Sequence, residues 1–94
     1  MNIYFTTRSK YDIAEIVEYI SNDNPQAARE WANSIFDEIR KLIDFPRIGR
    51  IVPEYSEDTI REIIKGQYRI VYKINQPEEE IDIIAVHHSK RLMI

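Results

Sequence analysis

The chain has 94 residues, of which 44% are hydrophobic, with two histidines, no cysteine and a formal net charge of −3. A chain of this length can bury one hydrophobic core, so we expect a single domain over residues 1–94. The lack of cysteine excludes disulfides and thiolate zinc sites. The first residues do not resemble a signal peptide, and no apolar run approaches the roughly 20 residues that cross a bilayer, so we expect a cytoplasmic protein without a membrane partner.

The negative charge lies in the first half of the chain. Residues 1–46 carry five basic and eight acidic side chains, whereas residues 47–94 carry eight of each. An acidic chain is a poor match to a protein whose affinity depends mainly on phosphate contacts. The second half can still present a local basic patch.

The first half predicts one short strand and two helices. Residues 2–6 are rich in β-formers and predict a strand. Apolar residues at helical spacing predict a helix from about Ser9 to Ser21. Asn24 is a suitable N-cap with Pro25 in the first helical position, and the apolar stripe of this second helix, which includes Trp31, runs to about Asp44. The two helices should form a hairpin.

The second half changes to the period of a β-sheet. Phe45-Pro46 ends the helix, and residues 47–53 form a basic loop in which Arg47 and Arg50 flank Gly49. Strands are predicted at residues 60–65, 68–74 and 81–88, with Gly66-Gln67 as a two-residue hairpin turn. The order β-α-α-β-β-β predicts an α+β fold in which the helical hairpin covers one face of a small antiparallel sheet.

The two-residue turn fixes which side chains share a face of the sheet. It pairs Lys65 with Tyr68, Ile64 with Arg69 and Glu62 with Val71. One face then carries Ile63, Tyr68, Ile70, Tyr72 and Ile74, with Arg61 and Lys65 towards its ends, and should lie under the helices. The other face carries Ile60, Glu62, Ile64, Arg69, Val71 and Lys73.

Arg69 is the first candidate site residue, because a guanidinium in mid-strand can bind a phosphate or a carboxylate. The alternative is a diagonal ion pair with Glu62 on a solvated face. His87 and His88 point to opposite faces of the last strand, so they cannot share one metal ion. We expect no metal and no cofactor. Either histidine could exchange a proton near pH 7 or be an ordinary strand-end residue.

Several segments in this order resemble the RelE/ParE superfamily of type II toxin–antitoxin toxins, and within it the ParE-like branch. The segments are DIAEIVEYI at 12–20, DNPQAA at 23–28, FPRIGR at 45–50, VPE at 52–54, YRIVY at 68–72, Val86-His87 and Lys90-Arg91. The resemblance implies a toxin, of a kind associated with plasmid stabilisation, with a helical hairpin on a small antiparallel sheet. It also implies a cognate antitoxin that wraps it in a hetero-oligomer.

The superfamily contains ribosome-dependent messenger RNA endoribonucleases, which are RelE-like, and ParE-like proteins associated with inhibition of DNA gyrase. Arg69 and Arg91 match two arginines of the ribonucleases, but Glu62 and Ile64 stand where those have lysines, and no tyrosine follows the last strand. A glutamate would oppose the charge that develops during cleavage. The gyrase interpretation therefore comes first, with no catalytic residue assigned.

Three hypotheses stay open. For a gyrase inhibitor, the candidate target contacts are Arg61, Lys65, Arg69, Lys73, His87, His88, Lys90 and Arg91, with Arg47 and Arg50 in the loop. For a ribonuclease acting on the ribosome, the catalytic candidates are Arg69, His87, His88 and Arg91. The third hypothesis is a non-toxic binding member of the family.

Overall fold

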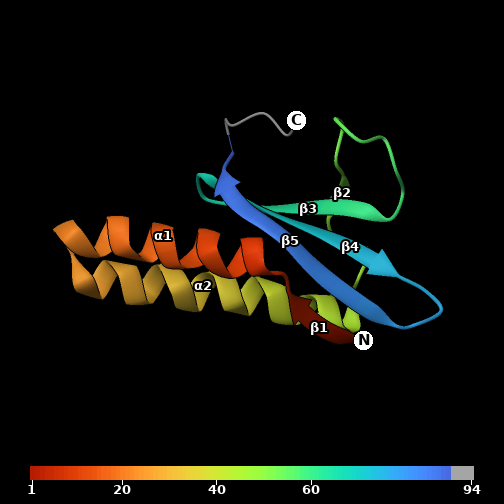
Figure 1. Ribbon diagram of the computed structural model, residues 1–94, viewed down its shortest axis with the longest axis horizontal. Helices are drawn as coiled ribbons and strands as arrows, with labels where there is room; N and C mark the ends of the chain where they lie inside the picture. The colour runs from red at the N-terminus through yellow and green to blue at the C-terminus, as the bar shows by residue number, and fades with distance from the viewer. Residues whose placement is uncertain (90–94) are drawn as a thin grey trace.

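The computed structural model describes residues 1–89. Its elements are β1 (Asn2–Phe5), α1 (Thr7–Asp23), α2 (Pro25–Asp44), β2 (Arg50–Ile51), β3 (Ile60–Lys65), β4 (Tyr68–Asn75) and β5 (Glu80–His88). The helices lie side by side as one layer and the sheet forms the other, and the connected end of the helical hairpin projects beyond the sheet (Figure 1). The predicted α+β fold with a helical hairpin on a sheet is confirmed.

The sheet is mixed rather than antiparallel, which corrects the expectation from the sequence. Its strand order is β1-β5-β4-β3-β2, and β1 runs parallel to β5 from the pair Asn2 and Glu80 to the pair Phe5 and Ile83. Parallel neighbours need a long crossover, which the helices and the other strands supply here. The sequence also missed β2, whose two residues pair with Glu62 and Arg61 of β3.

Side-chain caps set where the helices begin. Thr6 Oγ1 accepts a hydrogen bond from the Ser9 backbone N–H at 3.1 Å, so α1 begins two residues before the expected Ser9. Asn24 Oδ1 accepts from the Ala27 N–H at 3.1 Å, with Pro25 in the first turn, as predicted. Thr6 Oγ1 also donates to the Ile83 carbonyl oxygen at 2.8 Å, which ties the start of α1 to β5.

The main core lies between α2 and the inner face of the sheet. Its buried members are Ile35, Ile39, Leu42, Ile70, Tyr72, Ile74, Ile81, Ile83 and Val86. Trp31 packs on the edge of this core and is only half-buried, with its ring 5.2 Å from that of Tyr68 in an edge-to-face contact. Its buried Nε1 donates no hydrogen bond to any of residues 1–89, which costs stability.

Tyr72 connects this core to the loop that follows α2. Its fully buried hydroxyl donates to the Pro46 carbonyl oxygen at 2.6 Å and accepts from the Gly49 N–H at 3.0 Å. Burial raises the pKa of Tyr72, so the hydroxyl keeps the proton that it donates. Gly49 cannot be larger, because an added Cβ would lie 2.6 Å from the Glu62 carbonyl oxygen.

Replacing Tyr72 with Phe should lower the free energy of unfolding by about 1–3 kcal/mol, because the buried Gly49 N–H loses its acceptor. Urea denaturation followed by circular dichroism measures the loss. The matched control is Tyr55→Phe at an exposed tyrosine, which should change the free energy by less than about 0.5 kcal/mol. Equal effects of the two substitutions would show that the Tyr72 hydroxyl does not hold the loop.

Candidate functional site

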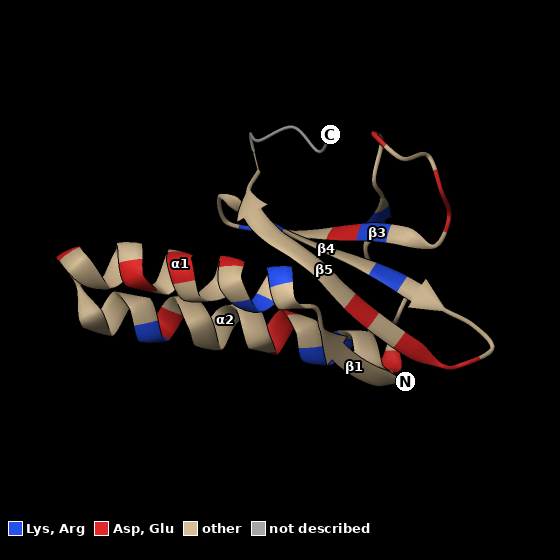
Figure 2. Cartoon of the chain, viewed as in Figure 1, with Lys and Arg blue, Asp and Glu red and all other residues tan. Residues whose placement is uncertain are grey.

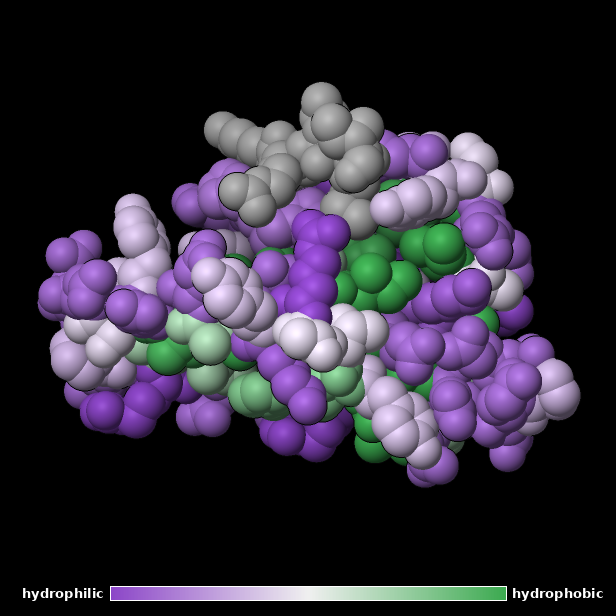
Figure 3. Space-filling model, in the orientation of Figure 1, coloured by the Kyte–Doolittle hydropathy of each residue, from purple (hydrophilic) through white to green (hydrophobic). Residues whose placement is uncertain are grey.

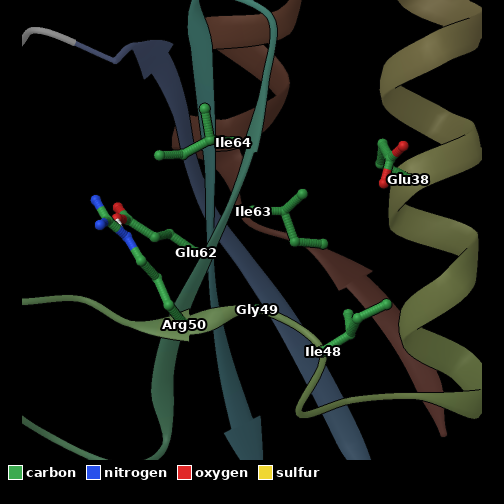
Figure 4. Close-up of a pocket in the computed structure, with 7 residues that line it drawn as sticks. All are labelled: Glu38, Ile48, Gly49, Arg50, Glu62, Ile63 and Ile64. Carbon is green, nitrogen blue, oxygen red and sulfur yellow. Dashed lines mark hydrogen bonds and ion pairs between the residues drawn. The ribbon is translucent and has the colours of Figure 1, made fainter.

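The β3–β4 hairpin places the site on the sheet face that points away from α2. Gly66 has a φ of 60°, and the pairs Lys65 with Tyr68, Ile64 with Arg69 and Glu62 with Val71 form as predicted. In Figure 4, Ile63 and Ile48 point towards α2, whereas Glu62 and Arg50 lie together on the opposite side of β3. The turn therefore separates an apolar face from a charged one.

Four charged side chains meet on this outer face, and we call Arg50, Glu54, Glu62 and Arg69 the ion-pair cluster. Glu62 is 1% exposed, and its two carboxylate oxygens accept from Arg69 Nη1 at 3.0 Å and Arg50 Nε at 2.6 Å. Arg69 Nη1 also contacts Glu54 Oε2 at 3.2 Å, and its Nε donates to the Ser89 carbonyl oxygen at 3.1 Å. The two positive and two negative charges leave the cluster without net charge.

The pair of Arg69 with Glu62 forms, but the expectation that it lies on a solvated face is wrong. The segment that contains β2 folds over this face, and Val52 packs on Val71, with Ile60 and Ile84 at the edge of the contact. This second small core excludes water from Glu62 and leaves Arg69 9% exposed. A buried pair costs more to form than a surface pair and far more to break.

Arg61 holds the loop from Arg47 to Asp58 in place. Its guanidinium donates to the Gly49 carbonyl oxygen at 2.9 Å and to Asp58 Oδ1 at 2.8 Å. Arg47 reaches the other oxygen of Asp58 at 2.5 Å. The Arg47 hydrogen bond, with help from Arg61, holds the pKa of Asp58 below its ordinary value of 3.8. Two of the predicted target contacts, Arg61 and Arg47, thus have structural partners.

The remaining predicted residues are spread over both faces. His87 is buried opposite Arg69, on the same face, and its Nδ1 lies 3.0 Å from the His88 carbonyl oxygen. His88 lies on the helix face, with its ring 5.8 Å from that of Tyr68, which confirms that the histidines point in opposite directions.

Lys65 pairs with Glu38 at 3.6 Å. Lys73, half-buried, lies opposite Asp82. The predicted contacts Lys90 and Arg91 lie outside the described residues.

A shallow hollow beside β3 is a feature that the sequence analysis missed. Its volume is about 270 Å³, and its lining is Glu38, Ile48, Gly49, Arg50, Glu62, Ile63 and Ile64. Ile48 and Ile64 are 57% and 47% exposed, and Phe45 and Ile51 nearby in the chain are also exposed. No periodicity marks this surface, because its side chains come from a helix, a loop and a strand.

Charged residues of both signs occur throughout the fold. In the view of Figure 2, acidic and basic residues lie on both the helices and the sheet. In the view of Figure 3, hydrophobic atoms gather near the middle of the molecule, and its two ends are mostly hydrophilic. Among residues 1–89, no three histidine or acidic side chains form a group that could hold a metal ion. No helix in that range is long and apolar enough to span a bilayer.

These features define a small α+β protein in which a helical hairpin covers one face of a five-stranded mixed sheet. Residues 3–93 match the family described as "ParE toxin of type II toxin-antitoxin system, parDE", and the chain belongs to this family. A search of curated proteins gave no significant match.

Two solved structures share the fold. A chain of the chromosomal ParDE system from P. aeruginosa superposes with a TM-score of 0.73 at 16% identity, over 94% of this chain and 95% of that one. A chain of the RelBE2 toxin–antitoxin complex from Mycobacterium tuberculosis gives 0.60 at 19% identity, over 93% and 95%. The resemblance to the ParE-like branch of the superfamily is confirmed.

Replacing Glu62 with Gln should lower the free energy of unfolding by about 3–5 kcal/mol, because buried Arg69 loses the nearer of the two carboxylates that contact its Nη1 atom. Urea denaturation at pH 7 measures the change. Glu38→Gln is the matched control, since Glu38 contacts Lys41 and Lys65 at the surface and should contribute less than about 1 kcal/mol. A loss at Glu62 no larger than that at Glu38 would mean that water screens the cluster.

Asp58→Asn should remove a pH-dependent part of the stability. Because the folded pKa of Asp58 is lowered, its ionised form stabilises the fold above the ordinary pKa of 3.8, and this contribution is lost as the pH falls through the lowered value. Denaturation curves from pH 7 to pH 3 should show wild type and Asp58→Asn converging in stability at acid pH. Glu57→Gln in the same loop is the control, and convergence of that variant alone would contradict the assignment.

Proposed function

We propose that this chain is a cytoplasmic toxin that arrests growth by inhibiting DNA gyrase and that a cognate antitoxin neutralises it. Membership of the ParE toxin family supports the proposals that the chain is a toxin and that its partner is an antitoxin. The choice of a protein target over RNA depends on the ion-pair cluster, whose chemistry is the main support for the proposal.

The ion-pair cluster is poorly suited to RNA cleavage. Attack by a 2′-hydroxyl develops negative charge on the phosphate, and a catalyst needs cations positioned to stabilise that charge. Arg69 matches an arginine of the RelE-like ribonucleases, but both Glu62 and Glu54 contact its Nη1 atom. A phosphate entering this site would meet two carboxylates as well as two guanidinium groups, so little of their positive charge is available.

The exposed apolar side chains beside β3 favour a protein partner. Ile48, Ile51 and Ile64 are each more than 40% exposed, and Ile48 and Ile64 line the hollow. Solvent-exposed aliphatic groups around a hollow are typical of protein–protein contacts and give nothing to a phosphate backbone. The loop that carries Ile48 is held by Tyr72 and Arg61, so this surface is already formed before a partner binds.

One observation favours a second candidate function, a ribosome-dependent endoribonuclease. His87 lies directly opposite Arg69 in the β4–β5 ladder and shares its face. An imidazole beside a guanidinium is a combination that can move a proton near a bound phosphate. In this alternative, a bound ribosome would have to open the ion-pair cluster.

Expression of the chain in cells without its antitoxin should arrest growth. Added in vitro, the chain should abolish supercoiling by purified gyrase and leave messages intact in a ribosome-containing extract. Ile48→Asp should relieve the arrest at least partly, because a charge in the apolar hollow disfavours the protein contact. Tyr19→Asp is the matched control, an equally drastic change at a residue that is 74% exposed on α1. Circular dichroism checks that both variants fold.

Each outcome of this experiment has a distinct meaning. Cut messages with normal supercoiling would replace the gyrase proposal with the ribonuclease. Normal growth with unchanged supercoiling and messages would leave a non-toxic binding member of the family. Relief of the arrest by Tyr19→Asp but not by Ile48→Asp would move the contact surface from the hollow to α1.

A further inference from the structure

The edge of the sheet beside the hollow is only partly paired. Strand β2 pairs with β3 only at Glu62 and Arg61. In Figure 4 the chain passes Gly49 and leaves β3 towards α2, whereas β3 continues to Lys65. Residues 63–65, which we call the open edge of β3, therefore have β4 on one side and no strand from residues 1–89 on the other.

Ile64 is the residue of the open edge whose backbone groups point away from β4. In an antiparallel pair, successive residues direct their N–H and C=O groups alternately to one side of the strand and to the other. Ile60 shows which residues point away, because its carbonyl oxygen accepts from the Val52 N–H at 3.1 Å, on the side opposite β4. Ile64 is four residues further along and points the same way. Within residues 1–89, no hydrogen bond reaches its N–H or C=O from that side.

These backbone groups adjoin aliphatic side chains with little net charge around them. Ile48 and Ile64 line the hollow, whose volume is about 270 Å³, and each is roughly half exposed. Glu38 lies on the α2 side of the hollow, but Lys65 pairs with it at 3.6 Å. The hollow thus combines apolar surface with one backbone donor and one backbone acceptor that water alone can satisfy in the isolated chain.

We propose that an extended segment of the protein partner adds to the sheet at the open edge of β3, pairs with the backbone of Ile64 and places apolar side chains in the hollow. Strand β2 shows that an extended chain fits along this edge, because Arg50 and Ile51 already pair with β3. A helix does not suit the site, since its interior N–H and C=O groups are bonded within the helix. In strand addition the backbone supplies hydrogen bonds and alternate side chains supply specificity.

The short length of the open edge sets what the partner segment needs. Only Ile64 offers backbone groups, so the pairing itself contributes little, and contacts with Ile48 and Ile64 have to supply most of the affinity. The hollow is formed before binding, because Tyr72 and Arg61 hold the Gly49 backbone beside it. The inference rests on the proposed function for the expectation of a protein partner, and it specifies how that partner engages the hollow.

Hydrogen exchange of the free chain, measured by NMR, tests whether the edge is open. The Ile64 amide should exchange about 10- to 100-fold faster than those of Ile63 and Lys65, which point towards β4. Equal protection of the three amides would show that the edge is already paired, and the inference would fail at this step.

Binding is tested by NMR titration of the full chain with the strand-forming peptide acetyl-Lys-Val-Thr-Val-Thr-Lys-amide. At millimolar concentration the peptide should shift the resonances of Ile48 and Ile64 and slow exchange of the Ile64 amide. Ile64→Pro should weaken binding about 3- to 10-fold, because it removes the N–H that the peptide bonds. Ile64→Val keeps this N–H and should weaken binding by no more than about 2-fold, through its smaller side chain.

The fold should accept proline at position 64, since the lost N–H has no partner on the β2 side within residues 1–89 and proline is tolerated on sheet edges. Circular dichroism checks this. If Ile64→Pro does not fold, the exchange and titration of the wild-type chain still decide the matter. Shifts confined to other surfaces, or none at Ile64, would refute strand addition. Equal binding by folded Ile64→Pro and by Ile64→Val would do the same.

The supercoiling assay separates this inference from the gyrase proposal. If the chain inhibits gyrase and folded Ile64→Pro inhibits it as strongly, the target does not pair with the open edge, and the inference fails while the gyrase proposal stands. If the chain does not inhibit gyrase at all, the gyrase proposal fails. The peptide titration then decides strand addition without it.

Discussion

The register of the β3–β4 hairpin is the constraint on which the rest of the molecule depends. Gly66 accepts a φ of 60° without strain, so two residues suffice to reverse the chain. With this turn, Ile70 and Tyr72 face the helices, and Glu62 and Arg69 face away from them. A slip of one residue would exchange the two faces and carry the arginine into the apolar core. Both the core and the ion-pair cluster therefore follow from one tight turn.

Features that depend on local chemistry were predictable from the sequence. The cap at Asn24, the end of α2 before Pro46 and the pairing of Arg69 with Ile64 across the hairpin all appear as expected. The burial of Glu62 was not predictable, because it depends on the segment around Val52, which has no periodicity of its own. That segment is held by contacts of Gly49 with the Tyr72 hydroxyl and with Arg61, which join residues 23 and 12 positions apart in the sequence. Spacing rules do not capture contacts of this range.

The parallel pairing of β1 and the hollow beside β3 could not be predicted from the sequence either. The residues of β1 alone do not determine which edge of the sheet the strand joins or in which direction it runs. Its position beside β5 is fixed by Thr6, which caps α1 and at the same time hydrogen bonds to Ile83 near the other end of the chain. The hollow likewise combines Glu38, Ile48 and Ile64 from three separate elements. Only the assembled fold brings such residues together.

The ion-pair cluster is better understood as a positioning device than as a source of stability. An apolar pair of similar volume at Glu62 and Arg69 could stabilise this fold as well or better, since burying charges costs solvation free energy. An apolar pair would remove the charged groups that Arg50 and Glu54 contact in this cluster. Because Glu62 holds one arginine with each carboxylate oxygen, it fixes where both guanidinium groups lie. The segment around β2, with its exposed Ile51, is thereby fixed against the sheet in the absence of any partner.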